Sequence, residues 1–168
     1  NRVLRKESLT LIDGKNVKKL ESVVARIFGK KYGLMVNSGS SANLLALSSL
    51  NLKKGSEVIT PTLTFSTTVA PIYQLGLIAK FVGVLDNKFI ADPEQIKNAI
   101  NKNTSAIMIP NLLGNIADWK IIYKIAKKKN IPVIEDSADT IGYKYRKGNT
   151  GKLSDIVTNS FYASHIIS

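Results

Sequence analysis

Residues 106–136 read AIMIPNLLGNIADWKIIYKIAKKKNIPVIED, and this stretch decides the fold class. Residues 106–109 form an apolar run typical of a buried strand, and residues 118–129 carry apolar side chains at helical spacing. A second apolar run over residues 132–134 ends in Glu135-Asp136. A strand, a helix and another strand in succession are typical of a parallel sheet whose crossover helices lie on its faces.

The same alternation extends in both directions along the chain. Asp92-Pro93 predicts a helix start, because Asp caps helices and Pro suits their first position. Pro71 should kink its helix or mark its start. We therefore expect an α/β fold, a three-layer α/β/α arrangement with a mostly parallel sheet. Helices are predicted over residues 17–28, 40–50, 67–75, 94–100 and 118–129, strands over residues 57–60, 78–84, 106–109, 132–134 and 156–161, and a short apolar run covers residues 32–36.

The composition suits one globular domain. The chain has 168 residues, of which 44% are hydrophobic, and no apolar run approaches the roughly 20 residues of a membrane span. Without cysteine there is no disulfide framework and no thiolate metal site, and a cytoplasmic setting is expected. Since the chain starts at Asn1 rather than Met and shows no domain boundary near Ser168, we expect residues 1–168 to be a truncated fragment.

The net charge of +12 raises the possibility of nucleic-acid binding. The lysines are scattered, however, and no aromatic residues alternate with them as stacking platforms. A solvated lysine-rich surface is the favoured interpretation, with attraction of phosphate-bearing ligands as the alternative, and neither nucleic acid nor a membrane is an expected partner.

Four polar clusters follow predicted strands, where ligands collect in parallel sheets. Residues 37–43 are small and precede a helix, which suits either a phosphate cradle or an ordinary capped turn. Residues 135–139 could bind metal, cap a helix or hold a cofactor nitrogen, and residues 110–115 have the composition of a turn. Residues 160–165 include His165, the only histidine, which could be structural or catalytic.

Together these clusters resemble the DegT/StrS family of vitamin B6-dependent sugar aminotransferases, which have the type I aminotransferase fold. The resemblance runs from about residue 20 to residue 168. It implies that residues 1–168 form a large pyridoxal or pyridoxamine phosphate-binding domain and that the protein is a homodimer. The motifs, in the family's order, are Ser38-Gly39-Ser40-Ser41-Ala42-Asn43, Glu57-Val58-Ile59-Thr60-Pro61, Thr64-Phe65, Leu113-Gly114-Asn115, Glu135-Asp136 and Ser160-Phe161.

The resemblance assigns roles to individual residues. Gly39 and Ser40 match the phosphate-binding turn, and Ser160 matches a serine that also contacts the phosphate. Phe65 matches an aromatic residue that stacks on the pyridine ring.

Two acidic residues complete the expected cofactor site. Asp136 matches the carboxylate that pairs with the ring nitrogen and keeps it protonated, which makes the ring a better electron sink. Asp139 stands where the family's aminotransferases carry glutamine.

His165 is the departure from the aminotransferase pattern. In the aminotransferases, the residue five places after the serine of the Ser-Phe pair is the lysine that binds the cofactor covalently, and here that place holds His165. Imidazole cannot form that bond, so the resemblance implies noncovalently held pyridoxamine phosphate. With Leu113-Gly114-Asn115 and Asp139, the chain is similar to the nucleotide-sugar 3-dehydratase branch, which includes CDP-4-keto-6-deoxyglucose and GDP-4-keto-6-deoxymannose 3-dehydratases of lipopolysaccharide biosynthesis.

This branch implies removal of the C3 hydroxyl from a nucleotide-linked 4-keto-6-deoxy sugar. His165 would move a proton at the cofactor's aminomethyl carbon, a role that suits an ordinary imidazole pKa of about 6.5. Some CDP-linked members carry an iron–sulfur cluster and imply a reductase partner. This chain has no cysteine, so a cluster is either absent or built from residues beyond Ser168.

Three other functions stay open at this point. One is a pyridoxal phosphate-dependent nucleotide-sugar aminotransferase, which a lysine reaching the cofactor would favour. Another is a non-catalytic regulatory relative, which failure to bind any B6 cofactor would favour. The last is a simple basic phosphate-binding module.

Overall fold

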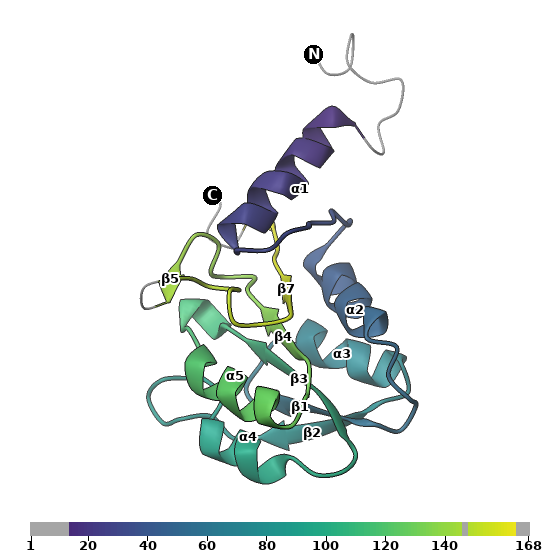
Figure 1. Cartoon of the computed structure of the whole chain (residues 1–168), viewed down its shortest axis with the longest axis vertical. Coiled ribbons are helices and arrows are strands. Elements are labelled where there is room, and N and C mark those ends of the chain that lie inside the picture. Colours follow the sequence, from purple (N-terminus) through teal and green to yellow (C-terminus); the bar gives the residue numbers. More distant parts are fainter. Residues whose placement is uncertain (1–13, 146–147, 164–168) are drawn as a thin grey trace.

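A parallel five-stranded sheet forms the centre of the molecule (Figure 1). The computed structural model describes residues 14–145 and 148–163, so His165 lies outside the described residues. The strand order is β2-β1-β3-β4-β7 and every neighbouring pair is parallel, which confirms the expected mostly parallel sheet. The strands are β1 (Glu57–Pro61), β2 (Ile78–Val82), β3 (Thr104–Pro110), β4 (Val133–Asp136) and β7 (Ile156–Thr158).

Helices cover both faces of this sheet and give the predicted three layers. On one face, α2 (Gly39–Ser49) and α3 (Ser66–Gln74) bury Leu47 and Ile72 against the strands. On the other, α4 (Pro93–Ala99) and α5 (Trp119–Lys128) bury Ile96, Trp119 and Ile122. The remaining long helix, α1 (Lys15–Ile27), lies beyond the β7 end of the sheet (Figure 1).

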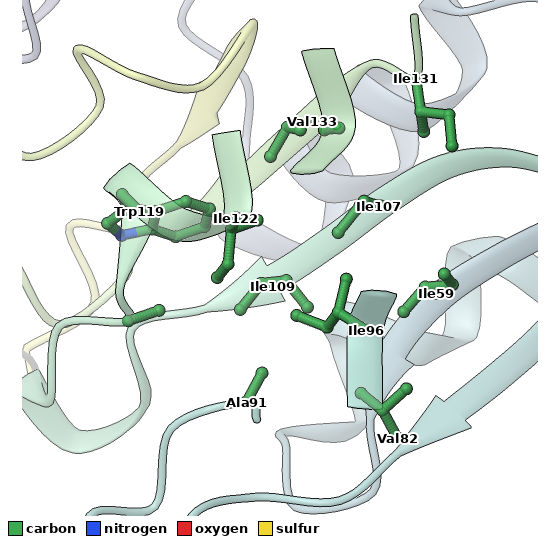
Figure 2. Close-up of a cluster of buried hydrophobic side chains, with 12 residues drawn as sticks. Ile59, Val82, Ala91, Ile96, Ile107, Ile109, Trp119, Ile122, Ile131 and Val133 are labelled. Atoms are coloured by element: carbon green, nitrogen blue, oxygen red, sulfur yellow. The ribbon is translucent and has the colours of Figure 1, made fainter. Parts of the chain in front are cut away.

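The strands supply both cores because successive side chains of a strand point to opposite faces. In β3, Ile107 and Ile109 face α4 and α5, while Ala106 and Met108 face α2 and α3. Figure 2 shows the first of these cores, with Trp119 of α5 packed beside the strand residues. The side chains of these four residues of β3 are fully buried, which explains the continuous apolar run over residues 106–109.

The short apolar run over residues 32–36 forms no strand, although the turn at residues 37–43 was expected to follow one. The Met35 N–H donates to the Glu21 carboxylate at 2.7 Å, and the side chains of Tyr32 and Leu34 are exposed. A stretch with strand-like composition becomes a strand only when a neighbouring strand pairs with it, and residues 32–36 pair with none of the described strands.

Other element boundaries also differ from the sequence prediction. The last strand ends at Thr158 rather than at residue 161, and β2 ends at Val82, with Val84 paired to Ala91 in an isolated bridge. The sequence patterns also missed three short elements, whose lengths are below what periodicity can detect. They are η2 (Leu112–Gly114), β5 (Lys144–Tyr145) and β6 (Gly148–Asn149).

No helix within the described ranges has the length and apolar character that crossing a bilayer requires.

Among the glycines with positive φ in the described part of the chain, Gly151 has the closest neighbours, and its replacement should lower stability strongly. Its φ is +86°, and an added Cβ would lie 2.8 Å from Val157 Cγ2 and 3.0 Å from the Phe28 carbonyl oxygen. Gly142 has a similar φ of +76° but nothing within 4 Å. We expect Gly151→Ala to lower the free energy of unfolding by about 2 kcal/mol more than Gly142→Ala, because only Gly151→Ala adds overpacking to backbone strain. Urea unfolding of both variants measures this, and equal losses would contradict it.

Candidate active site

The carboxyl ends of the strands open into one cavity of about 570 Å³. Its wall comes from the start of α2, the turns after β1, β3 and β4, and the residues that follow β7. Six of the seven residues that the sequence singled out line this cavity, and the seventh, His165, lies outside the described residues. The six are Gly39, Ser40, Phe65, Asp136, Asp139 and Ser160.

The first turn of α2 lines part of the cavity. Ser38 caps the helix, and its hydroxyl accepts the Ser41 N–H at 3.1 Å. An added Cβ on Gly39 would lie 3.0 Å from Ser160 Cβ and 3.3 Å from its Oγ, so only glycine lets the helix start approach Ser160 this closely. The turn contains no acidic residue. Free N–H groups, the helix dipole and the Ser160 hydroxyl together suit a phosphate.

Asp136, the last residue of β4, is held firmly at the cavity wall. Its side chain is buried, and Oδ2 accepts the Asn43 amide at 2.9 Å and the Thr68 hydroxyl at 2.8 Å. The Thr158 hydroxyl donates to Asn43 Oδ1 at 2.6 Å and fixes that amide in turn. Side chains from three other elements, α2, α3 and β7, therefore orient this one carboxylate of β4, and such support fixes the geometry of a functional group.

Asn43 is oriented by a break in the hydrogen bonding of α3. Its Nδ2 also donates to the Thr67 carbonyl oxygen at 3.2 Å. In a regular helix that carbonyl would accept the N–H of residue 71, but Pro71 has no N–H. Pro71 lies inside α3 and so does not mark its start, and the carbonyl that it leaves free is satisfied by a side chain of the neighbouring helix.

The residues that position Asp136 were not predicted from the sequence; they are Asn43, Thr68 and Thr158. Asn43 could have been found, because it lies three and four residues before the buried Ala46 and Leu47 and so shares their inward face. A polar side chain on the apolar face of a helix needs a buried partner. Thr68 and Thr158 carry no comparable signal.

A second buried network, centred on Asn111, ties the turns after β3 and β4 together. Its Nδ2 donates to Glu135 Oε1 at 2.8 Å and Ser137 Oγ at 3.0 Å. Its Oδ1 accepts the Trp119 indole N–H at 2.9 Å and the Ala117 N–H at 3.1 Å. Both turns contribute cavity residues, so this network sets the distance between two walls of the site.

Glu135 is a fully buried acid behind the site. Burial raises the pKa of its carboxyl above the ordinary value, while hydrogen bonds from Ser137, Asn111 and Gly151 oppose the rise. Nearby, the Lys30 ammonium donates to the Ser154 carbonyl oxygen. Burial lowers the pKa of Lys30, and the negative charge of Glu135 counteracts part of that change.

The raised pKa of Glu135 makes stability depend on pH. The unfolded carboxyl ionises near 4.5, and the folded one at higher pH. The stabilisation that Glu135 contributes is therefore complete below the unfolded pKa and declines as pH rises through the folded pKa. Urea unfolding from about pH 4 to pH 8 measures the free energy of unfolding of the wild type and of Glu135→Gln. As pH rises, the wild type should lose stability relative to Glu135→Gln. Glu94→Gln, at an exposed helix position, is the control. A difference that moves in the wild type's favour would contradict this expectation.

Asp139 holds the turn after β3. Its Oδ2 accepts the Leu113 N–H at 3.1 Å, and Leu113 has φ 54° and ψ 31°, in the left-handed region. That conformation costs a leucine roughly 1–2 kcal/mol. The structure shows that Asp139 contacts the backbone of Leu113. The cofactor-binding role that was predicted for Asp139 stays a prediction.

Phe65 ends the turn after β1 and directly precedes α3. Its side chain is 66% exposed although it belongs to the cavity wall. A large exposed aromatic ring at a cavity is available for stacking, and the stacking on the cofactor ring that the resemblance implies for Phe65 stays a prediction.

Comparison with known proteins identifies the family. The model of the DegT/DnrJ/EryC1/StrS aminotransferase family matches residues 1–168, and the chain belongs to this family. It is 42% identical over 167 residues to a dTDP-4-dehydro-2,6-dideoxy-D-glucose 3-dehydratase of Saccharopolyspora spinosa, covering 95% of this chain and 36% of the relative.

Solved structures give the same result. A histidine-to-asparagine mutant of GDP-4-keto-6-deoxymannose-3-dehydratase with bound GDP-perosamine superposes with a TM-score of 0.85 at 38% identity, covering 90% of this chain and 41% of that one. An Escherichia coli GDP-4-keto-6-deoxy-D-mannose-3-dehydratase with bound hydrated pyridoxal phosphate gives a TM-score of 0.77 at 40% identity, covering 82% and 37%. The chain thus spans about 40% of the length of these relatives.

The residues of the cavity fit a pyridoxal-type cofactor. The close approach of Gly39 to Ser160 leaves N–H and hydroxyl donors for a phosphate. Asp136 offers a fixed carboxylate, and Phe65 an exposed ring, on the same wall. The family depends on this cofactor, and solved relatives contain it. The role of each individual residue stays a prediction.

Proposed function

We propose that the full-length protein removes the C3 hydroxyl of a nucleotide-linked 4-keto-6-deoxy sugar with the help of pyridoxamine phosphate, in deoxysugar and lipopolysaccharide biosynthesis. One observation carries the proposal: the chain has His165 where the family's aminotransferases have their lysine, five residues after Ser160 of the cavity wall. The relatives named above as 3-dehydratases of GDP- and dTDP-linked sugars support this choice of reaction.

The residues of the chain would bind the cofactor and leave its reactive side open. The first turn of α2 and Ser160 would hold the phosphate, and Phe65 would stack on the ring. Asp136, oriented by Asn43, would keep the ring nitrogen protonated. The bound cofactor supplies an amino group for the sugar ketone and a conjugated ring that accepts electrons.

His165 would then act as the general base and acid. It would take a proton from the cofactor's aminomethyl carbon and return one later, while the C3–O bond of the sugar breaks and the hydroxyl leaves. An imidazole that ionises near neutral pH can do both. Since it makes no covalent bond to the cofactor, the cofactor would depend on the phosphate and ring contacts for binding.

The proposal extends to the whole protein. Residues 1–168 would be the cofactor-binding domain of a longer, cytoplasmic enzyme that works as a homodimer on a nucleotide-sugar substrate. Light scattering on the full-length protein tests the assembly, and an active strict monomer would contradict it.

A single-turnover assay tests the reaction. Full-length protein loaded with pyridoxamine phosphate is mixed with GDP- and dTDP-linked 4-keto-6-deoxyhexoses, and the products are analysed by mass spectrometry. We expect loss of the C3 hydroxyl. A product that gains an amino group at C4 with its C3 hydroxyl intact would show an aminotransferase instead, and failure to bind either B6 phosphate would favour a regulatory relative.

A further inference from the structure

Two residues have an unusual backbone conformation for their type. Among the described residues, the non-glycine positions with positive φ are three asparagines together with Phe89 at 55° and Leu113 at 54°. Asparagine adopts this region readily, whereas a bulky residue does so only when its surroundings impose it. Such strain in proteins concentrates at ligand-binding positions, so both residues call for an explanation.

The conformation of Leu113 is imposed by the buried framework of the site. Asp139 accepts its N–H, the Gly114 N–H donates to the Asn111 carbonyl oxygen at 3.3 Å, and the Asn115 N–H donates to that of Leu112 at 3.0 Å. Asn111 is itself anchored in the network behind the cavity. The strained turn is therefore fixed from both sides.

The fixed turn presents the Leu113 side chain to the cavity. This side chain is 75% exposed and belongs to the cavity wall together with Phe65 and Asp136. Hydrogen bonds thus hold a leucine in a strained backbone conformation that leaves its side chain exposed at the cavity. A ligand that covers Leu113 would bury this apolar surface.

The chemistry of the proposed substrate selects which part of it Leu113 can cover. The hexose is the reacting part of a nucleotide-linked 4-keto-6-deoxy sugar, so it must reach the wall that Leu113 shares with Phe65 and Asp136. Its hydroxyls and ketone lose hydrogen bonds to water when a leucine covers them, and the one purely apolar substituent of the hexose is its C6 methyl group. We propose that Leu113 is a specificity-determining residue that packs against this methyl group and favours 6-deoxy sugars over 6-hydroxy sugars. This inference rests on the proposed function.

Binding of unreactive sugar pairs tests the proposal without catalysis. The pairs are dTDP-glucose with dTDP-6-deoxyglucose and GDP-mannose with GDP-6-deoxymannose, titrated calorimetrically into the full-length protein loaded with pyridoxamine phosphate. The variants are Leu113→Gly and Leu113→Ala. Phe89→Gly is the matched control, because Phe89 is also left-handed and half exposed but lies outside the cavity wall.

We expect the wild type to bind the 6-deoxy member of a pair roughly three- to tenfold more tightly, the value of one methyl contact. Leu113→Gly and Leu113→Ala should abolish this preference, and Phe89→Gly should retain it. Thermal unfolding should show both glycine variants at least as stable as the wild type, since glycine accepts positive φ without strain.

The outcomes separate this inference from the proposed function. A wild type that binds nucleotide sugars without preference, or a preference that survives Leu113→Gly, would overturn the role of Leu113 alone. A wild type that binds no member of either pair would overturn the proposed function and this inference with it.

Discussion

Replacement of His165 by asparagine is expected to lower the rate of C3 dehydration by the full-length protein by about 10²- to 10⁴-fold, the usual contribution of a general acid–base group. Asparagine keeps a polar side chain of similar size but cannot take up a proton near neutral pH. The cofactor should stay bound, because the first turn of α2, Ser160 and Asp136 are unchanged. Single-turnover rates and the absorbance of bound cofactor measure the two effects separately.

His165→Lys is the sharper variant. A lysine can bind pyridoxal phosphate covalently, so borohydride should fix the cofactor to the variant but not to the wild type. Dehydration should fall while transamination of the sugar appears. Fixation of the cofactor to another lysine of the wild type, or full dehydration by His165→Asn, would show that the catalytic base lies elsewhere.

Replacement of Asp136 by asparagine should lower the same rate by roughly 10²- to 10³-fold, the range for losing one fixed electrostatic partner of a reacting group. Asparagine has the shape of aspartate but no charge to keep the ring nitrogen protonated. The donors of Asn43 and Thr68 both point at Oδ2 and would hold the amide oxygen there, so the amide nitrogen would take the place of Oδ1. Rates and the cofactor spectrum report the change.

Asp92→Asn is the matched control for this substitution. Asp92 caps α4 by accepting the Glu94 N–H at 2.9 Å, and asparagine caps helices equally well. Its rate should equal that of the wild type. An Asp136→Asn enzyme as fast as this control would refute the pairing of Asp136 with the ring nitrogen.

The fold could be predicted from the sequence because its core strands are long runs of buried side chains. Residues 106–109 are buried on both faces, so their pattern has only one good interpretation. The run over residues 32–36 looks similar but forms no strand. Whether a strand forms depends on a neighbour to pair with, and local sequence carries no information on that neighbour.

For the candidate site, the residues that meet at the cavity could be predicted, but the residues that orient them could not. Motif order placed Gly39, Asp136 and Ser160, and the parallel sheet brings them to one cavity because the carboxyl ends of its strands share an edge. The residues that orient Asp136 were missed, since hydrogen bonds between α2, α3 and β7 join positions far apart in the chain. The left-handed turn at Leu113 was missed for another reason, because nothing about a leucine suggests positive φ.

Pro71 illustrates how an absent atom can specify an orientation. The two amide hydrogens of Asn43 go to the Thr67 carbonyl and to Asp136, and its oxygen accepts from Thr158. A half-turn of this amide would set its oxygen against the Thr67 carbonyl and the Asp136 carboxylate, acceptor against acceptor in both cases. An amino acid with an N–H at position 71 would compete for the Thr67 carbonyl and remove one reason for the amide to face this way. The orientation of the Asn43 amide beside Asp136 thus depends in part on Pro71, a residue outside the cavity wall.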